Sequence, residues 1–187
     1  VPQAFAHFPA APLTLFSYSL NWSLTPDRAG EFHLFGLLFH LANAILLYLV
    51  CRKLSRGLLP EPVAMLSGML FAVHPLGSEA LVYLVGRPML LGTFFALLCV
   101  LLLLRIEERR PTSFIPLALA LCAYALAVAS CFAFALLPVA LIAFHNVLTA
   151  GEDRARLVRM HTPFLLLMLG IFTVIGAQPS EPPFPPE

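Results

Sequence analysis

Three ionisable side chains, His74, Glu79 and Arg87, lie within fourteen residues of one another and carry the clearest chemistry in this sequence. A guanidinium can hold a phosphate through two parallel hydrogen bonds, and a nearby carboxylate can orient it or accept a proton. The same spacing allows Glu79 and Arg87 to pair with each other, which lowers the cost of placing two charges beside a membrane. The three residues are therefore candidates for binding a lipid phosphate, with a simple ion pair as the alternative.

A second polar set, His33, His40 and Asn43, interrupts an apolar segment at spacings of seven and three residues. These spacings place all three side chains on one stripe of a helix that faces other helices. Hydrogen bonding between helices is the first interpretation. Ligation of a haem or pigment metal by His33 or His40 is the alternative. The two rings cannot share a metal, because seven residues separate them by about 10 Å along the helix axis, and we predict no metal site and no catalytic set.

Composition determines the class of protein. Hydrophobic residues make up 60% of the chain and charged residues 11%, and the mean hydropathy is +0.89. A soluble domain of 187 residues could not bury so many hydrophobic side chains away from its surface, so we expect a polytopic membrane protein. The formal charge of +1 and the lack of a basic stripe make nucleic acid an unexpected partner. The cysteines lack metal-ligand spacing and are interpreted as small core residues: Cys51, Cys99, Cys122 and Cys131.

Continuous apolar runs predict an all-α bundle, because a membrane barrel needs short alternating strands instead. We expect about six transmembrane helices, at His33 to Leu54, Pro62 to Pro75, Gly86 to Leu104, Ser113 to Ala129, Cys131 to Leu148 and Pro163 to Ala177. Three basic clusters, each two crossings from the next, begin at Arg52, Arg105 and Arg154. The positive-inside rule assigns them to the cytoplasm and both termini to the outside. The preference for arginine over lysine suits a GC-rich bacterial genome, so we expect a bacterial inner membrane.

The predicted bundle covers residues 32–178 and is preceded by an outer segment, 1–31. Within that segment Pro12 to Leu24 is too short and too polar to cross, but suits an amphipathic helix at the membrane interface, with Tyr18 and Trp22 at head-group level. Residues 179–187 are rich in proline and are expected to form an extended tail. The chain begins with Val1, so we expect a processed protein or part of a longer product.

Several of these segments resemble one known family. Phe32 to Leu49, Leu70 to Pro75, Glu79-Ala80 and Gly86-Arg87 with Leu90-Leu91 are similar to the membrane module of the transmembrane and tetratricopeptide-repeat O-mannosyltransferases. The resemblance implies a fold of the GT-C superfamily and a polyprenyl-phosphate sugar as donor. It also implies that His74, Glu79 and Arg87 line or shape a groove for the lipid phosphate, with His40 and Asn43 on the preceding helix.

This chain departs from the family's pattern in three places. Met89 stands where the family has an aspartate, and Ser130-Cys131-Phe132 stands where it has Ser-Lys-Glu. The family's first span and its acidic outer loop, which supplies the catalytic carboxylate, have no counterpart in these 187 residues. Sugar transfer needs a general base near the acceptor and stabilisation of the departing phosphate. The sequence therefore resembles a truncated and degenerate member of the family.

Three functional hypotheses follow. The first is a non-catalytic membrane subunit that acts as a scaffold or accessory component, with membrane lipids and other integral membrane subunits as its partners and no cofactor. The second is a fragment of a glycosyltransferase that uses a polyprenyl-phosphate sugar. The third, more distant, is a haem- or pigment-binding subunit that uses His33 or His40.

Overall fold

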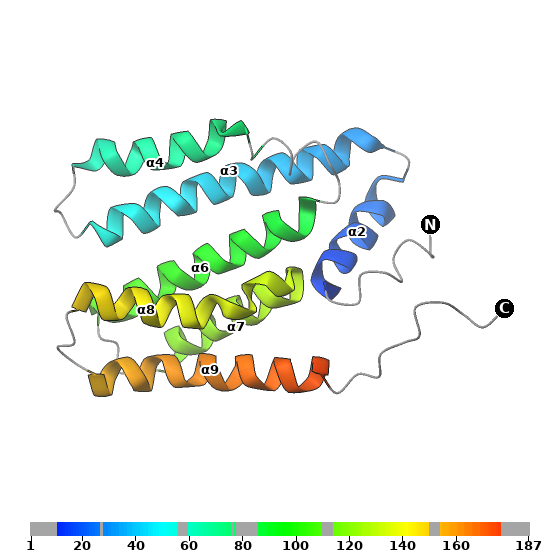
Figure 1. Cartoon of the computed structure of the whole chain (residues 1–187). Coiled ribbons are helices and arrows are strands. Elements are labelled where there is room, and N and C mark those ends of the chain that lie inside the picture. Colours follow the sequence, from blue (N-terminus) through cyan, green and yellow to red (C-terminus); the bar gives the residue numbers. More distant parts are fainter. Residues whose placement is uncertain are drawn as a thin grey trace. The chain divides into compact units, whose positions relative to one another are not determined.

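The computed structural model describes residues 11–26, 28–55, 60–75, 77, 86–109, 114–149 and 154–176. The regular secondary structure in these ranges is helical, which confirms the all-α prediction. Figure 1 shows the helices in chain order: α2 (Pro12–Leu24), α3 (Ala29–Leu54), α4 (Glu61–Val73), α6 (Arg87–Arg109), α7 (Ile115–Ser130), the 3-10 helix η2 (Phe132–Leu136), α8 (Leu137–Thr149) and α9 (Arg154–Gly176). The chain forms two compact units, Val1–Phe134 and Ala135–Glu187.

Two helical segments are long and apolar enough to cross a membrane by length and composition, Gly30–Leu54 and Arg87–Glu108. The other apolar helical segments of the described ranges have 10–17 residues, among them Val158–Val174 within α9, so six crossings stay a prediction. Large apolar side chains on the outer sides of α3 and α4, such as Leu38, Ile45, Met69 and Val73, are exposed. Such faces fit insertion into a membrane, where lipid covers them.

The last predicted crossing, Pro163 to Ala177, begins inside a longer helix. The last helix begins at Arg154 and not at Pro163, so Pro163 lies in the interior of α9. The residues between these positions, including Ala155, Leu157 and Met160, favour the helix strongly enough for it to run through the proline. Proline removes one backbone hydrogen bond there but does not end the helix. The predicted tail at 179–187 lies outside the described residues.

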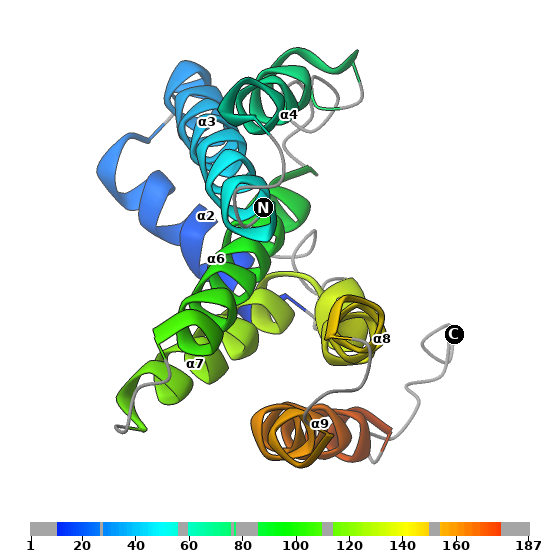
Figure 2. The same ribbon diagram turned by 90° about the vertical axis from the view of Figure 1, so that its left-hand side faces the viewer.

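Helices α3 and α4 of the first unit run antiparallel and lie side by side in both Figure 1 and Figure 2. The Tyr48 hydroxyl donates to Glu61 at 2.8 Å near the start of α4. Further along, a methyl group added to Gly68 would lie 2.9 Å from the carbonyl oxygen of Ala44. Close approach of two backbones through a small residue is typical of helix packing in membranes. Because α4 has 13 residues and α3 has 26, α4 ends about halfway along α3.

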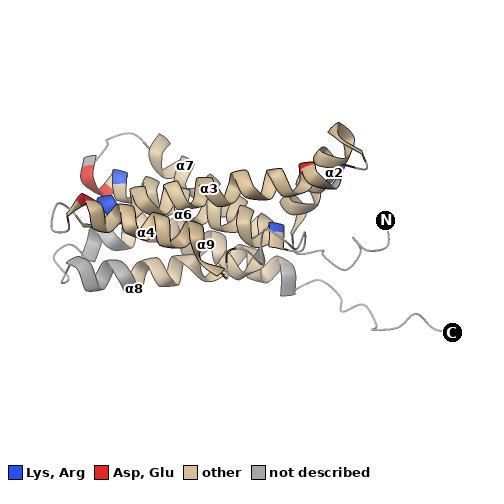
Figure 3. Ribbon diagram, turned by 90° about the horizontal axis from the view of Figure 1, so that it is seen from above, with Lys and Arg blue, Asp and Glu red and all other residues tan. Residues whose placement is uncertain are grey.

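Opposite charges meet where α3 ends, α4 begins and α6 ends. Arg52 lies 3.6 Å from Glu61, and Lys53 pairs with Glu108. The charged residues at this end of the first unit are seen together in Figure 3. Cations in the last turn of α3 also interact favourably with the negative end of the helix dipole. Two of the three predicted basic clusters therefore share one end of this unit, and their cytoplasmic orientation stays a prediction.

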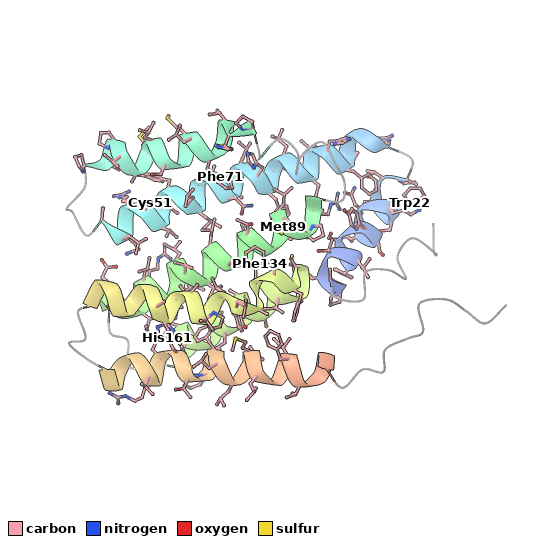
Figure 4. The ribbon with its side chains drawn as sticks, viewed as in Figure 1. Trp22, Cys51, Phe71, Met89, Phe134 and His161 are labelled. Carbon is pink, nitrogen blue, oxygen red and sulfur yellow. The ribbon has the colours of Figure 1, made fainter. Side chains whose placement is uncertain are left out.

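Helix α6 packs against η2 through a glycine. A methyl group added to Gly92 would lie 2.3 and 2.6 Å from two ring carbons of Phe134, and 3.3 Å from Cβ of Cys131; Phe134 is labelled in Figure 4. We expect Gly92→Ala to lower the free energy of unfolding by about 1–3 kcal/mol, the usual cost of overpacking. Thermal unfolding in detergent measures this change.

The matched control is Gly30→Ala, because a methyl group at Gly30 meets nothing within 4 Å. This control should be neutral or slightly stabilising, since alanine favours the helix over glycine by up to about 1 kcal/mol. Combining Gly92→Ala with Phe134→Leu should restore part of the lost stability. A Gly92→Ala protein that is as stable as the Gly30→Ala protein would contradict the expected clash.

Candidate functional site

Arg87 is the first residue of α6 and is 3% exposed. One terminal nitrogen of its guanidinium donates to the carbonyl oxygen of Ser17 at 3.3 Å. The other donates to Oδ1 of Asn21 at 2.9 Å and to the carbonyl oxygen of Phe32 at 3.2 Å. The residue that the sequence assigned to a phosphate is therefore bonded to the protein itself, and it joins the start of α6 to both α2 and α3.

Aromatic rings cover the same guanidinium. Its central carbon lies 4.4 Å from the ring centroid of Tyr18, 4.5 Å from that of Phe35 and 5.3 Å from that of Phe32. A cation over an aromatic face is attracted to the ring, and the attraction grows when water is excluded. We call Ser17, Tyr18, Asn21, Phe32 and Phe35 together the Arg87 enclosure. It combines ring faces with uncharged oxygen acceptors.

Burial raises the pKa of the Tyr18 phenol, and the positive charge of Arg87 opposes that shift only in part. Tyr18 therefore stays a neutral phenol at physiological pH, and it contacts the cation through its ring and not as a phenolate. Among the residues of the enclosure no carboxylate offsets the charge of Arg87. Glu79, the predicted pairing partner, lies outside the described residues, so the predicted ion pair stays untested.

The polar side of α2 builds the enclosure. Thr14 and Ser17 are buried, and the Thr14 hydroxyl donates to the carbonyl oxygen of Ser130 at 2.9 Å. Phe16 and Leu20 on the other side are exposed, as is Trp22, which Figure 4 labels. The helix predicted at Pro12 to Leu24 is present with the expected bounds. Its polar side faces protein and its apolar side points outward, which suits the predicted position at a membrane interface.

His74 lies at the end of α4 and is exposed. Its carbonyl oxygen accepts a hydrogen bond from the Gly77 amide at 2.9 Å. Of the predicted phosphate ligands, the structure thus describes one exposed residue, His74, and one enclosed residue, Arg87. Their cooperation with Glu79 on a phosphate stays a prediction.

The three residues of the second polar set differ in burial. His40 and Asn43 are 2% and 0% exposed, whereas His33 is exposed. The difference follows from the length of α4, which ends beside His40 and so cannot cover a residue two turns nearer the start of α3. His40 Nε2 lies 3.1 Å from the carbonyl oxygen of Ala72, and its ring stacks on Phe71 with centroids 5.2 Å apart. Asn43 Nδ2 donates to the carbonyl oxygen of Leu90 at 3.0 Å. These contacts tie α3 to α4 and α6.

The described ranges contain no group of three histidine, cysteine or acidic side chains that could hold a metal ion. The four cysteines are free thiols. Cys99 is buried, as predicted for a core residue, but the same prediction is wrong for Cys122, which is exposed on α7. Cys131 contacts Met89, with 3.5 Å between the two sulfur atoms.

The sequence interpretation missed the partners of Arg87. Ser17 and Asn21 are four residues apart, a spacing that places them on the same side of a helix. That polar side was a usable signal that α2 docks onto something charged or polar. Nothing in the sequence pairs it with α6, because 70 residues separate Ser17 from Arg87.

These observations define a class: an all-helical protein with two helices long enough for a membrane and a buried arginine at the start of one of them. About half of the chain is similar in sequence to the TMTC O-mannosyl-transferases, which confirms the predicted resemblance. It is 34% identical over 92 residues to protein O-mannosyl-transferase TMTC3 of Mus musculus. It is 32% identical over 99 residues to TMTC1 of Homo sapiens and 27% identical over 108 residues to protein O-mannosyl-transferase F38B6.6 of Caenorhabditis elegans.

The matched regions cover 49%, 51% and 58% of this chain in that order. They cover 10%, 11% and 16% of the relatives, so the similarity concerns only a small part of those longer proteins. No protein-family profile matches the chain, and no solved structure matches it. The chain is thus TMTC-like over about half of its length.

Proposed function

We propose that this chain is a glycosyltransferase-like membrane module with a structural role, packing its helices against other membrane subunits, and that its described residues do not catalyse sugar transfer. The observation that carries the proposal is the Arg87 enclosure. Three donor contacts and three ring faces engage the guanidinium inside the protein. An arginine so engaged would have to leave α2 and α3 before it could bind a phosphate bidentately.

Two departures from the family's pattern also support this role, because they touch each other. Met89 stands at the position of the family's aspartate, and Cys131 at the position of its lysine. In this chain their sulfur atoms are 3.5 Å apart. In this chain an uncharged contact between two sulfur atoms stands where the family has an aspartate and a lysine. A thioether and a thiol supply neither the negative charge of a carboxylate nor a cation that binds phosphate.

The second candidate is a part of an enzyme that uses a polyprenyl-phosphate sugar. The names of the similar proteins, O-mannosyl-transferases, favour it. Catalysis would then depend on residues beyond those described. The haem- or pigment-binding alternative gains no support from His40, whose Nε2 is engaged by a backbone carbonyl and whose ring is enclosed.

Two measurements on the full chain separate these functions. Native mass spectrometry after gentle extraction from membranes should find it in an assembly of fixed stoichiometry. After purification and reconstitution in bilayers with polyprenyl-phosphate mannose and an acceptor peptide, the chain should transfer no sugar. The structural proposal would be overturned if the unmutated chain transferred sugar and the Arg87→Lys variant did not, while α2 of the variant stayed protected from protease. Arg105→Lys is the matched control, because Arg105 is an exposed arginine of the same helix.

A further inference from the structure

Helix α2 turns its apolar side outward and its polar side toward the protein. Phe16, Leu20 and Leu24 are exposed and recur every four residues, so they form one line along the helix, which we call the α2 stripe. Thr14 and Ser17 on the opposite side are buried. A water-soluble protein places such a helix the other way round, with its polar side in the solvent and its apolar side on the core. The orientation of α2 therefore indicates an apolar medium outside the stripe.

The hydroxyl groups beside the α2 stripe are satisfied without water. Ser19 and Ser23 are exposed, but each donates to a backbone carbonyl of its own helix. Ser19 Oγ lies 3.1 Å from the oxygen of Leu15, and Ser23 Oγ lies 2.8 Å from that of Leu20. A serine bonded in this way does not need a partner from the solvent. The sequence of α2 also contains no charged residue, so its exposed side has the chemistry of a lipid-covered surface.

The charge-free stretches of α3 and α6 have the thickness of a bilayer core. No Asp, Glu, Lys or Arg lies between Arg87 and Arg105 of α6, a stretch about 27 Å long at about 1.5 Å per residue. None lies between Glu31 and Arg52 of α3, a stretch about 31 Å long. Both lengths fit a hydrocarbon core about 30 Å thick. Arg87 and Glu31 therefore mark one boundary of that core.

Helix α2 is fixed at this boundary. The Arg87 guanidinium donates to the carbonyl oxygens of Ser17 in α2 and Phe32 in α3, so the three helices meet at one level. Helix α2 also runs across the direction of α3 and α6 in Figures 1 and 2. A helix that crosses the spanning helices at the edge of the core lies along the membrane plane, where an apolar side contacts lipid.

We propose that the α2 stripe is a lipid-binding surface, with Phe16, Leu20 and Leu24 against the glycerol groups and upper acyl chains of one leaflet. Arg87 holds the other side of the helix from within the protein. Uncharged phospholipid suffices for this contact, because α2 offers apolar area and no cation. The inference goes beyond the proposed function, since it does not depend on whether the chain transfers sugar.

Trp22 tests this proposal without any mutation, because it is the one tryptophan of the sequence and is 48% exposed on α2. The full chain is reconstituted in phosphatidylcholine bilayers whose acyl chains carry bromine, a fluorescence quencher, either near the carboxyl end or near the methyl end. Bromine near the carboxyl end should quench Trp22 several-fold more strongly than bromine near the methyl end. Iodide in the water should quench it only weakly.

Two variants extend the test to the stripe and calibrate the depth. Phe16→Trp in a Trp22→Phe background moves the reporter onto the stripe and should show the same order of quenching. Leu41→Trp in that background is the matched control, because Leu41 is exposed near the middle of α3. Its tryptophan should be quenched most by bromine near the methyl end.

Three results would overturn the proposal. Strong quenching of Trp22 by iodide, with weak quenching by both lipids, would mean that the exposed side of α2 faces water. Weak quenching by all three would mean that protein covers it, here a second copy of this chain. Strongest quenching by bromine near the methyl end would place α2 at the centre of the bilayer. Each result comes from the unmutated protein, so the test holds even where a variant does not fold.

Discussion

Replacement of Arg87 by alanine is expected to lower the free energy of unfolding by about 3 kcal/mol and to release α2 from the first unit. The change leaves the acceptors on Ser17, Asn21 and Phe32 without their donor, and an unsatisfied buried polar group costs about 1–3 kcal/mol. It also removes the cation from the ring faces of the enclosure, each contact worth about 0.5–2 kcal/mol. Water that enters the enclosure recovers part of this cost. The expected loss of about 3 kcal/mol is therefore smaller than the sum of the separate contacts.

Limited proteolysis between α2 and α3, together with thermal unfolding in bilayer discs, measures the Arg87→Ala effect. Arg87→Lys should recover only part of the stability, because an ammonium cannot present a planar fork to acceptors from two helices. Arg105→Ala, at an exposed position of α6, is the control for loss of an arginine. Unchanged protection of α2 in Arg87→Ala would mean that Thr14 and its Ser130 contact suffice to hold the helix.

Replacement of Gly68 by leucine is expected to separate α3 from α4 and to lower the free energy of unfolding by about 3 kcal/mol or more. Even a methyl group at Gly68 would lie 2.9 Å from the Ala44 carbonyl oxygen and 3.1 Å from Cβ of Tyr48. These atoms belong to the backbone and to the base of a side chain, so they cannot rotate away. Overpacking typically costs about 1–3 kcal/mol, and here a whole helix must move.

The Gly68→Leu effect has a second readout, because moving α4 also breaks the bond between His40 and Ala72. The His40 ring signals should therefore change along with the melting temperature. Gly170→Leu is the control, since a methyl group at Gly170, in the interior of α9, meets nothing within 4 Å. A Gly68→Leu protein that melts like the Gly170→Leu protein would contradict the close packing of α3 and α4.

The helices were predictable because apolar runs, prolines and charges mark them locally. Pro12, Glu61-Pro62 and Ile115-Pro116 mark helix starts where proline is tolerated, and Arg52-Lys53 marks an end. Pro163 does not mark a helix start, because a proline is a local signal that neighbouring residues can outweigh. Periodicity also placed His33 with His40, but it carries no information on where the neighbouring helix stops.

The site was predictable only in part. A lone arginine in an apolar run predicts a special environment, and Arg87 has one. Whether that environment is a ligand or the protein's own oxygens depends on which helix folds over it. The contacts of Arg87 with Ser17 and Asn21 span 70 and 66 residues, and no local pattern encodes such a pairing.

The docking of α2 also sets an order of assembly during synthesis. Thr14 of α2 bonds to Ser130, which lies 116 residues later in the chain. At about 5–20 residues per second, a ribosome needs roughly 6–23 s to make that stretch. Through that interval the Thr14 hydroxyl of α2 lacks its acceptor on Ser130, although the apolar side of the helix is already able to rest on a lipid surface. Helix α2 is thus translated well before the residue that its Thr14 hydroxyl binds, and its docking is completed late.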